Sequence, residues 1–268
     1  MNSILNNGVK MPLLGLGVYD MHADEAIKAT RFALETGYRL IDTAAMYENE
    51  REIGIALKDS QIPRNELFIT TKVNNADQGF ETTLKAYTES LQKLQLDYVD
   101  LYLVHWPLKA TRKATWLALE KLYNDGLVKA IGVANYLEPF LDELKKYSSI
   151  IPAVNQVEFS PYLFLENLLN RCKTDDIALQ AYSPLVRGEK FNDKKLIDLA
   201  NKYSKTPAQI IIRWALQIGV STIPKSANFS RIKENFNVFD FEITSEDIAK
   251  INAFNENYRV VENPLDLL

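Results

Sequence analysis

Short runs of apolar and β-branched residues alternate along the chain with longer stretches in which apolar residues recur at helical spacing. There are eight such runs, and their length and composition between turn residues are typical of β-strands. Most lack a regular polar alternation, which indicates strands buried on both faces. We therefore expect strands over residues 13–17, 39–43, 67–73, 99–105, 130–135, 152–159, 178–183 and 221–225.

Each expected strand is followed by at least one stretch with the periodicity of an amphipathic helix. Before the first strand, the turn Asn6-Asn7-Gly8 favours an N-terminal hairpin. Helices are expected over residues 23–36, 49–59, 79–94, 113–125, 137–147, 163–173, 193–203, 207–218, 229–238 and 245–254.

Eight strand-and-helix units in series predict an α/β fold, a single (β/α)₈ TIM barrel over residues 1–268 with an N-terminal β-hairpin and extra C-terminal helices. The alternative is a doubly wound open sheet. For dinucleotides that fold usually carries a G-x-G-x-x-G turn after its first strand, and Gly15-Leu16-Gly17 lacks the third glycine. The barrel is therefore the favoured interpretation.

The composition is that of an ordinary globular protein, with 47% hydrophobic and 25% charged residues. The net charge of −4 argues against a general nucleic-acid or anionic-membrane surface, and no apolar run reaches the roughly 18 residues of a membrane helix. Cys172 is the only cysteine, so no intrachain disulfide forms, and residues 1–10 do not resemble a secretory signal. These features predict a cytoplasmic protein, and we expect a monomer without nucleic-acid or membrane partners.

Polar side chains end several expected strands, where a barrel of this type builds its active site. Asp42, Lys72 and His105 end the second, third and fourth strands, and Tyr47 follows the second by a short loop. Taken singly, Asp42 could start a turn or cap a helix, and a histidine in so apolar a run is usually a core residue. Lys72 is more informative, because a lysine on an apolar strand is seldom buried unless it is paired. Together, an acid, a phenol, a lysine and a histidine at one barrel mouth favour catalysis.

Two other kinds of chemistry find no support. No spacing of His, Cys and carboxylate residues suggests a metal site. Ser183 is not part of a G-x-S-x-G nucleophile elbow, which argues against serine hydrolysis.

Several motifs resemble those of the aldo-keto reductase family, and they occur in order at the expected strand ends. The segment GYRLIDTA (37–44), followed by Tyr47 and by Asn49-Glu50, is similar to the signature of that family. Further matches are LVHWP (103–107), IGV (131–133), NQVE (155–158), YSPL (182–185) and IPKS (223–226). The resemblance runs from about residue 8 to residue 264 and is strongest to the shorter microbial members.

The resemblance implies a catalytic tetrad of Asp42, Tyr47, Lys72 and His105. Tyr47 would be the general acid that protonates the carbonyl oxygen, and His105 would orient that oxygen. An unperturbed tyrosine has a pKa near 10, and we expect the neighbouring Lys72 ammonium to lower the pKa of Tyr47. Asp42 would pair with Lys72 and keep it charged.

The resemblance also implies NADPH, preferred over NADH, as the cofactor. Tyr182 would stack on the nicotinamide, and Asn135 and Gln156 would bond its carboxamide. The remaining expected contacts are Ser183 and Leu185 along the pyrophosphate, Lys225, Ser226, Asn228 and Arg231 around the 2′-phosphate, and Glu234 and Asn235 near the adenine.

The sequence departs from the family pattern in informative places. Ala134 stands where serine or threonine is usual, which leaves one carboxamide contact open. Asp176 stands where glycine is frequent, so we expect a left-handed backbone there. The specificity loops are trimmed, which predicts an open substrate site; its expected lining is Tyr19, Asn74, His105, Trp106 and the tail from Tyr258 onward.

The sequence thus predicts an enzyme, an NADPH-dependent reductase of small aldehydes and ketones. The reverse reaction, alcohol oxidation, uses the same residues. Two alternatives from other classes are a Schiff-base lyase with Lys72 as the amine nucleophile and an NADPH-binding sensor with slow turnover. Pairing of Lys72 with Asp42 argues against the lyase, and the complete tetrad argues against the sensor.

Overall fold

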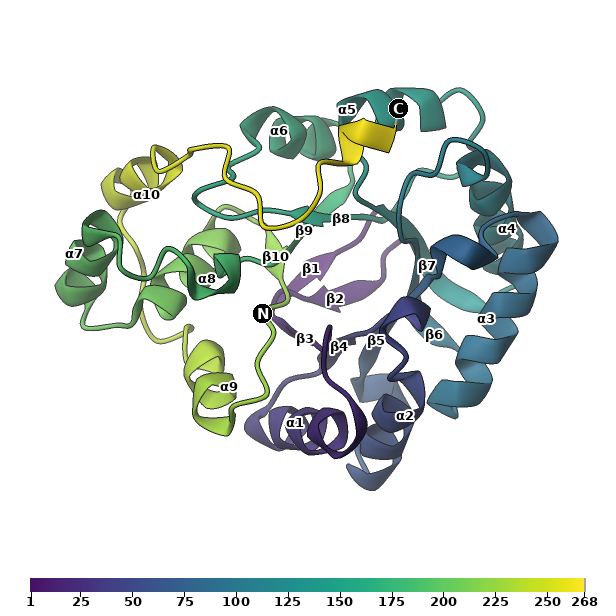
Figure 1. Ribbon diagram of the computed structural model, residues 1–268, viewed down its shortest axis with the longest axis horizontal. Helices are drawn as coiled ribbons and strands as arrows, with labels where there is room; N and C mark the ends of the chain where they lie inside the picture. Colours follow the sequence, from purple (N-terminus) through teal and green to yellow (C-terminus); the bar gives the residue numbers. More distant parts are fainter. Residues whose placement is uncertain (268) are drawn as a thin grey trace.

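Eight parallel strands surround a common axis, and helices form a layer outside them (Figure 1). The computed structural model describes residues 1–267. Consecutive strands are hydrogen-bonded neighbours throughout the order β3 to β10, so the predicted (β/α)₈ barrel is confirmed. The strands are β3 (Gly15–Gly17), β4 (Leu40–Asp42), β5 (Phe68–Val73), β6 (Val99–Val104), β7 (Val128–Ala134), β8 (Val154–Glu158), β9 (Ala178–Tyr182) and β10 (Ser221–Thr222).

The helices cover the outer face of the barrel and include the extra C-terminal ones that the sequence predicts. α6 begins three residues later than expected, because Ser160 Oγ accepts the N–H groups of Tyr162 and Leu163 and holds a turn before it. The helices are α1 (Ala23–Thr36), α2 (Glu50–Asp59), α3 (Phe80–Leu94), α4 (Arg112–Asn124), α5 (Glu138–Leu144), α6 (Glu166–Thr174), α7 (Lys194–Tyr203), α8 (Pro207–Gln217), α9 (Phe229–Phe236) and α10 (Ser245–Asn252). Among residues 1–267, none of these helices is long and apolar enough to cross a membrane.

The barrel closes where β10 meets β3. Two isolated parallel bridges, Leu14↔Thr222 and Gly17↔Lys225, join these strands. A Cβ on Gly17 would lie 2.7 Å from the Ile223 carbonyl oxygen, so the strands can approach this closely only because residue 17 is glycine. β10 ends at Thr222, earlier than predicted; Pro224 lies just beyond and has no N–H for a ladder.

A two-stranded hairpin, β1 (Asn2–Ile4) and β2 (Lys10–Pro12), closes the end of the barrel at which the strands begin. Its turn is the predicted one, and Asn6 and Asn7 donate to the carbonyls of Pro152 and Lys129, at or just before the starts of β8 and β7. With this end closed, the carboxyl ends of the strands are the place for a site.

Asp176, between α6 and β9, has φ of +56°, which confirms the left-handed backbone expected there. An L-residue is strained in this region and glycine is not. We therefore expect Asp176→Gly to raise the free energy of unfolding by about 0.5–1 kcal/mol. Urea denaturation measures this, and Lys173→Gly, inside α6, should shift stability the other way. A less stable Asp176→Gly protein would show that the side chain contributes more than the strain costs.

Candidate active site

The four residues of the expected tetrad meet at the open end of the barrel. Asp42 ends β4, Lys72 lies near the end of the neighbouring β5, and His105 directly follows β6. Tyr47 lies on a short 3₁₀ helix, η1 (Ala45–Tyr47), in the loop after β4. The structure therefore brings together residues that are up to 63 positions apart in sequence (42 to 105).

Buried hydrogen bonds hold the loop that carries Tyr47. The Thr43 hydroxyl donates to Asn49 Oδ1 at 2.6 Å, and Asn49 Nδ2 donates to the carbonyls of Val18 and Met21 at 2.8 and 3.0 Å. Asn49 is fully buried, so its amide fixes both ends of the loop against the neighbouring βα connection. In the sequence, Asn49 belongs to a family motif, but its role in holding the loop depends on contacts with residues 18 and 21 that the sequence does not show.

Lys72 is the central group of the site. Its ammonium is fully buried and donates to Asp42 Oδ1 at 2.6 Å, to the Thr43 carbonyl at 2.9 Å and to Tyr47 Oη at 3.3 Å. Burial alone would lower the pKa of Lys72, but Asp42 and Tyr47 raise it above its ordinary value. The amine therefore stays protonated, which disfavours a Schiff-base nucleophile at this position.

The pKa of Tyr47 differs in direction from the sequence-based expectation. Burial raises it above its ordinary value, and the Lys72 ammonium lowers it without overcoming the effect of burial. Asp42 offsets part of the effect of Lys72, because its carboxylate lies next to the same ammonium. The expected lowering by Lys72 is therefore present, but the net direction is upward, because burial together with the Asp42 carboxylate outweighs it.

The surroundings of His105 favour its neutral form. Burial lowers its pKa well below the ordinary value, and the Lys72 ammonium adds to that effect. Its ring packs edge-on against Tyr47, with centroids 5.7 Å apart. Nδ1 is buried and has no hydrogen-bond partner among residues 1–267.

A chain of amides continues from Asp42 across the barrel interior. Gln156 Nε2 donates to Asp42 Oδ2 and to Gln180 Oε1, both at 2.7 Å, and Gln180 Nε2 donates to Ser221 Oγ at 3.1 Å. Gln180 is fully buried and was missed in the sequence analysis. The available signal was a glutamine two residues before Tyr182 on an apolar strand, which places both side chains on the inner face.

Asn135 and Tyr182 form a pair at the mouth. The Tyr182 hydroxyl donates to Asn135 Oδ1 at 2.8 Å, and Asn135 Nδ2 donates to the His105 carbonyl at 2.8 Å. Asn135 and Ser183 each come directly after a strand. Both residues have positive φ, +66° for Asn135 and +47° for Ser183. Such conformations are sparsely populated by residues other than glycine, and they persist where the surrounding structure fixes them.

The expected phosphate-binding residues lie at the start of α9. Lys225 and Arg231 are exposed, and neither forms an ion pair within the part of the chain that the structure describes. Asn228 Oδ1 caps the helix by accepting the Arg231 N–H at 3.1 Å, and Ser226 Oγ accepts the Asn228 N–H at 3.2 Å. Glu234 accepts the Thr206 hydroxyl at 2.8 Å, so that carboxylate already has one structural partner.

The expected substrate-lining residues differ in exposure. The Tyr19 side chain is 56% exposed and lies edge-on against Tyr47, with ring centroids 5.1 Å apart. Asn74 and Trp106 are half-buried, and the Trp106 carbonyl accepts Gln78 Nε2 at 2.8 Å. These residues follow β3, β5 and β6, so they lie on the same face of the barrel as the tetrad.

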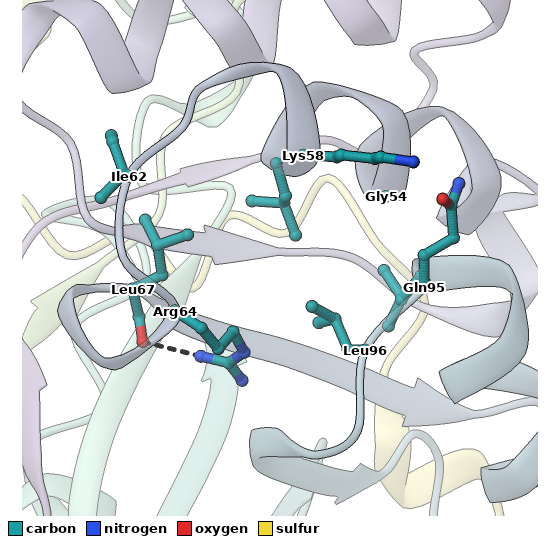
Figure 2. Close-up of a pocket in the computed structure, with 9 residues that line it drawn as sticks. Gly54, Lys58, Ile62, Arg64, Leu67, Gln95 and Leu96 are labelled. Carbon is teal, nitrogen blue, oxygen red and sulfur yellow. Dashed lines mark hydrogen bonds between the residues drawn. The ribbon is translucent and has the colours of Figure 1, made fainter.

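A cavity of about 360 Å³ opens elsewhere, where the end of α2 meets the end of α3 (Figure 2). Its lining is mainly leucine and isoleucine, and Arg64 there donates to the Leu67 carbonyl at 3.0 Å. None of the expected site residues lines it. Within residues 1–267 no group of three or more His, Cys, Asp or Glu side chains could hold a metal ion.

Comparisons with known proteins agree with this arrangement. A sequence model of the Aldo/keto reductase family matches residues 13–256. The chain is 52% identical over 265 residues to glyoxal reductase of Bacillus subtilis, covering 98% of this chain and 96% of the relative. It is 44% identical to methylglyoxal reductase DkgA of Escherichia coli, covering 97% and 95%. The solved structure of a Bombyx mori aldo-keto reductase in complex with NADP is 35% identical, covers 98% of this chain and 95% of that chain, and superposes with a TM-score of 0.92.

Proposed function

The chain belongs to the aldo-keto reductase family, and from that premise we propose that it is an NADPH-dependent reductase of aldehydes and ketones in which Tyr47 donates the proton. The observation that supports this most is the contact of the Tyr47 hydroxyl with the buried Lys72 ammonium at 3.3 Å, beside the neutral His105. The relatives named glyoxal and methylglyoxal reductase support small 1,2-dicarbonyl compounds as substrates.

The residues at the ends of β9 and β10 fit a dinucleotide with a 2′-phosphate. Lys225 and Arg231 lack carboxylate partners within residues 1–267. Lys225 lies just before α9 and Arg231 lies in its first turn, where backbone N–H groups favour an anion. Barrels commonly bind phosphate after their last two strands. The half-buried Tyr182 ring at the mouth would hold the nicotinamide, which, when bound, supplies a hydride to the carbonyl carbon.

Tyr47 is suited to deliver the proton. A phenol is already protonated at neutral pH and burial raises the pKa of Tyr47 further, so a proton is present when negative charge develops on the carbonyl oxygen. Lys72 lies against Tyr47 Oη and stabilises the phenolate that remains after transfer. Asp42 and the Thr43 carbonyl hold the Lys72 ammonium in place, so this stabilisation requires no rearrangement.

His105 positions the substrate oxygen. A neutral imidazole offers one N–H donor, and the low pKa of His105 maintains that form across the physiological range. Packing against Tyr47 holds the ring beside the phenol, so the two donors can serve the same substrate oxygen. The test of the proposed function is oxidation of NADPH, followed by absorbance, with methylglyoxal and a simple aromatic aldehyde. Binding of NADPH without turnover on a broad carbonyl panel would favour the sensor.

Ala134 offers a smaller test of the cofactor assignment. It is buried at the end of β7, directly before Asn135, and has no hydroxyl to offer the carboxamide. We expect Ala134→Ser to tighten NADPH binding by about 0.5–1.5 kcal/mol, the net contribution of one hydrogen bond. Fluorescence titration measures this, and Ala134→Gly controls for the change in packing. Unchanged affinity would mean that another group already serves the carboxamide.

A further inference from the structure

Glu158, the last residue of β8, is a buried carboxylate that the proposed chemistry does not use. Only 3% of its side chain is exposed. Because side chains alternate along a strand, Glu158 shares the inner face of the barrel with Gln156, one layer nearer the mouth. A buried charge is costly unless it is paired and hydrogen-bonded, so its partners indicate what it stabilises.

Both partners of Glu158 come from the C-terminal segment. Oε1 accepts the Val260 N–H at 2.6 Å, and Oε2 lies 3.7 Å from Arg259 Nη1. Oε2 is buried and has no hydrogen bond within residues 1–267. A backbone N–H that reaches an inward-facing carboxylate in the top layer must itself lie over the barrel mouth.

The segment between α10 and the final 3₁₀ turn, η5 (Pro264–Leu267), has no regular secondary structure, and in Figure 1 its yellow trace passes over the side of the barrel where β8 and β9 lie. Its earlier part is held at the rim: the N–H groups of Glu256 and Tyr258 donate to the Tyr162 carbonyl at 3.0 and 2.9 Å. Glu158 makes the next attachment along the segment, and it comes from a barrel strand. Beyond residue 258, this carboxylate makes a polar attachment of the segment to the barrel, beside the apolar packing of Val260 on the core.

We propose that Glu158 is a positioning residue of the reductase, which holds residues 259–261 across the barrel mouth so that they form one wall of the substrate site. This inference rests on the proposed function in one respect, because it takes the mouth as the place where substrate binds. Glu158 pairs in register with Tyr182 on β9, so the held segment lies beside the ring that would face the cofactor. A carboxylate that helps to hold such a wall acts on substrate fit without contacting the reacting atoms.

The attachment itself can be measured without any enzyme assay. Trypsin cleaves after Arg259 only when the segment leaves the mouth. The rate of cleavage is then proportional to the fraction of molecules in which the segment is detached. A hydrogen bond to a charged acceptor contributes about 1.5–3 kcal/mol, so we expect Glu158→Ala to release residues 260–268 at least fivefold faster, measured by intact mass. Glu158→Gln keeps an acceptor oxygen for Val260 and should fall between wild type and Glu158→Ala.

The matched control is Glu242→Gln. It removes a carboxylate that lies 3.6 Å from an arginine, Arg213, but that side chain is 85% exposed and contacts no part of the mouth assigned here. Its cleavage rate should equal that of wild type. Equal rates for wild type and folded Glu158→Ala would overturn the proposed attachment.

The wall is tested by kinetics. With the segment released, a small dicarbonyl such as methylglyoxal loses contact surface, so its KM should rise at least fivefold while kcat stays within twofold. The KM of a bulky aromatic aldehyde should change less. Should Glu158→Ala fail to fold, Glu158→Gln gives the same comparison with a smaller expected rise in KM, because it removes the charge and keeps a side chain of the same size in the buried position. A loss of kcat with unchanged KM for both substrates would show that residues 259–261 do not form a wall of the substrate site. Absence of turnover in the wild-type protein would reject the proposed function, whereas the proteolysis result would still test the attachment.

Discussion

Tyr47→Phe is expected to lower kcat for carbonyl reduction by about 10²–10⁴-fold, the usual contribution of a general acid, and to leave the Kd for NADPH close to wild type. The phenylalanine ring can still pack against Tyr19 and His105, so the shape of the site is kept. Only the hydroxyl next to Lys72 is lost, and with it the proton.

The measurement is kcat under conditions in which chemistry limits turnover, with Kd from fluorescence titration. Tyr147→Phe is a suitable control, because the Tyr147 hydroxyl is buried without a hydrogen-bond partner in the described part of the chain and lies outside the proposed site. Retention of more than roughly a tenth of wild-type kcat, against the expected 10²-fold loss or more, would mean that another group supplies the proton.

Lys225→Met is expected to weaken NADPH binding by about 1.5–3 kcal/mol, roughly 10- to 150-fold, and to change NADH binding little. The reason is that only NADPH carries the 2′-phosphate, and a charge-assisted hydrogen bond to phosphate is the interaction removed. Because Lys225 is exposed, the preference of the wild-type protein for NADPH should also shrink at high salt.

The control for that variant is Lys233→Met, an exposed lysine in the last turn of the same helix, α9. Lys225 lies just before α9, so Lys233→Met removes a like charge at the opposite end of that helix, away from the proposed phosphate site. Equal affinities of wild type for the two cofactors, or equal losses in Lys225→Met, would reject the phosphate-site assignment and leave the tetrad untouched.

The sequence predicts the strands and helices well because their signals are local. The apolar runs around Ile41, Ile69 and Leu103 coincide with β4, β5 and β6, and α1 has the predicted bounds. The positions of Asp42 and Lys72 at one barrel mouth follow from the same reasoning, since parallel strands bring their carboxyl ends to one face.

Features that depend on contacts between distant segments could not be predicted in this way. The closure of β10 on β3 depends on how closely Gly17 approaches Ile223, and no local pattern reports that distance. The direction of the Tyr47 pKa shift depends on the balance between burial and charge, which requires coordinates. Glu158 could be identified only as the last residue of the NQVE motif, because its partner is 102 positions away (158 to 260).

The N-terminal hairpin and the segment around Val260 lie at opposite ends of the barrel axis, and this has a practical consequence for immobilising the protein. Met1 is 71% exposed and belongs to the hairpin that closes the end at which the strands begin. Coupling to a support through that residue would leave the mouth turned toward the solution. Coupling through the C-terminal side would tether the very segment that Glu158 draws over the mouth, and substrate would then have to diffuse past the support.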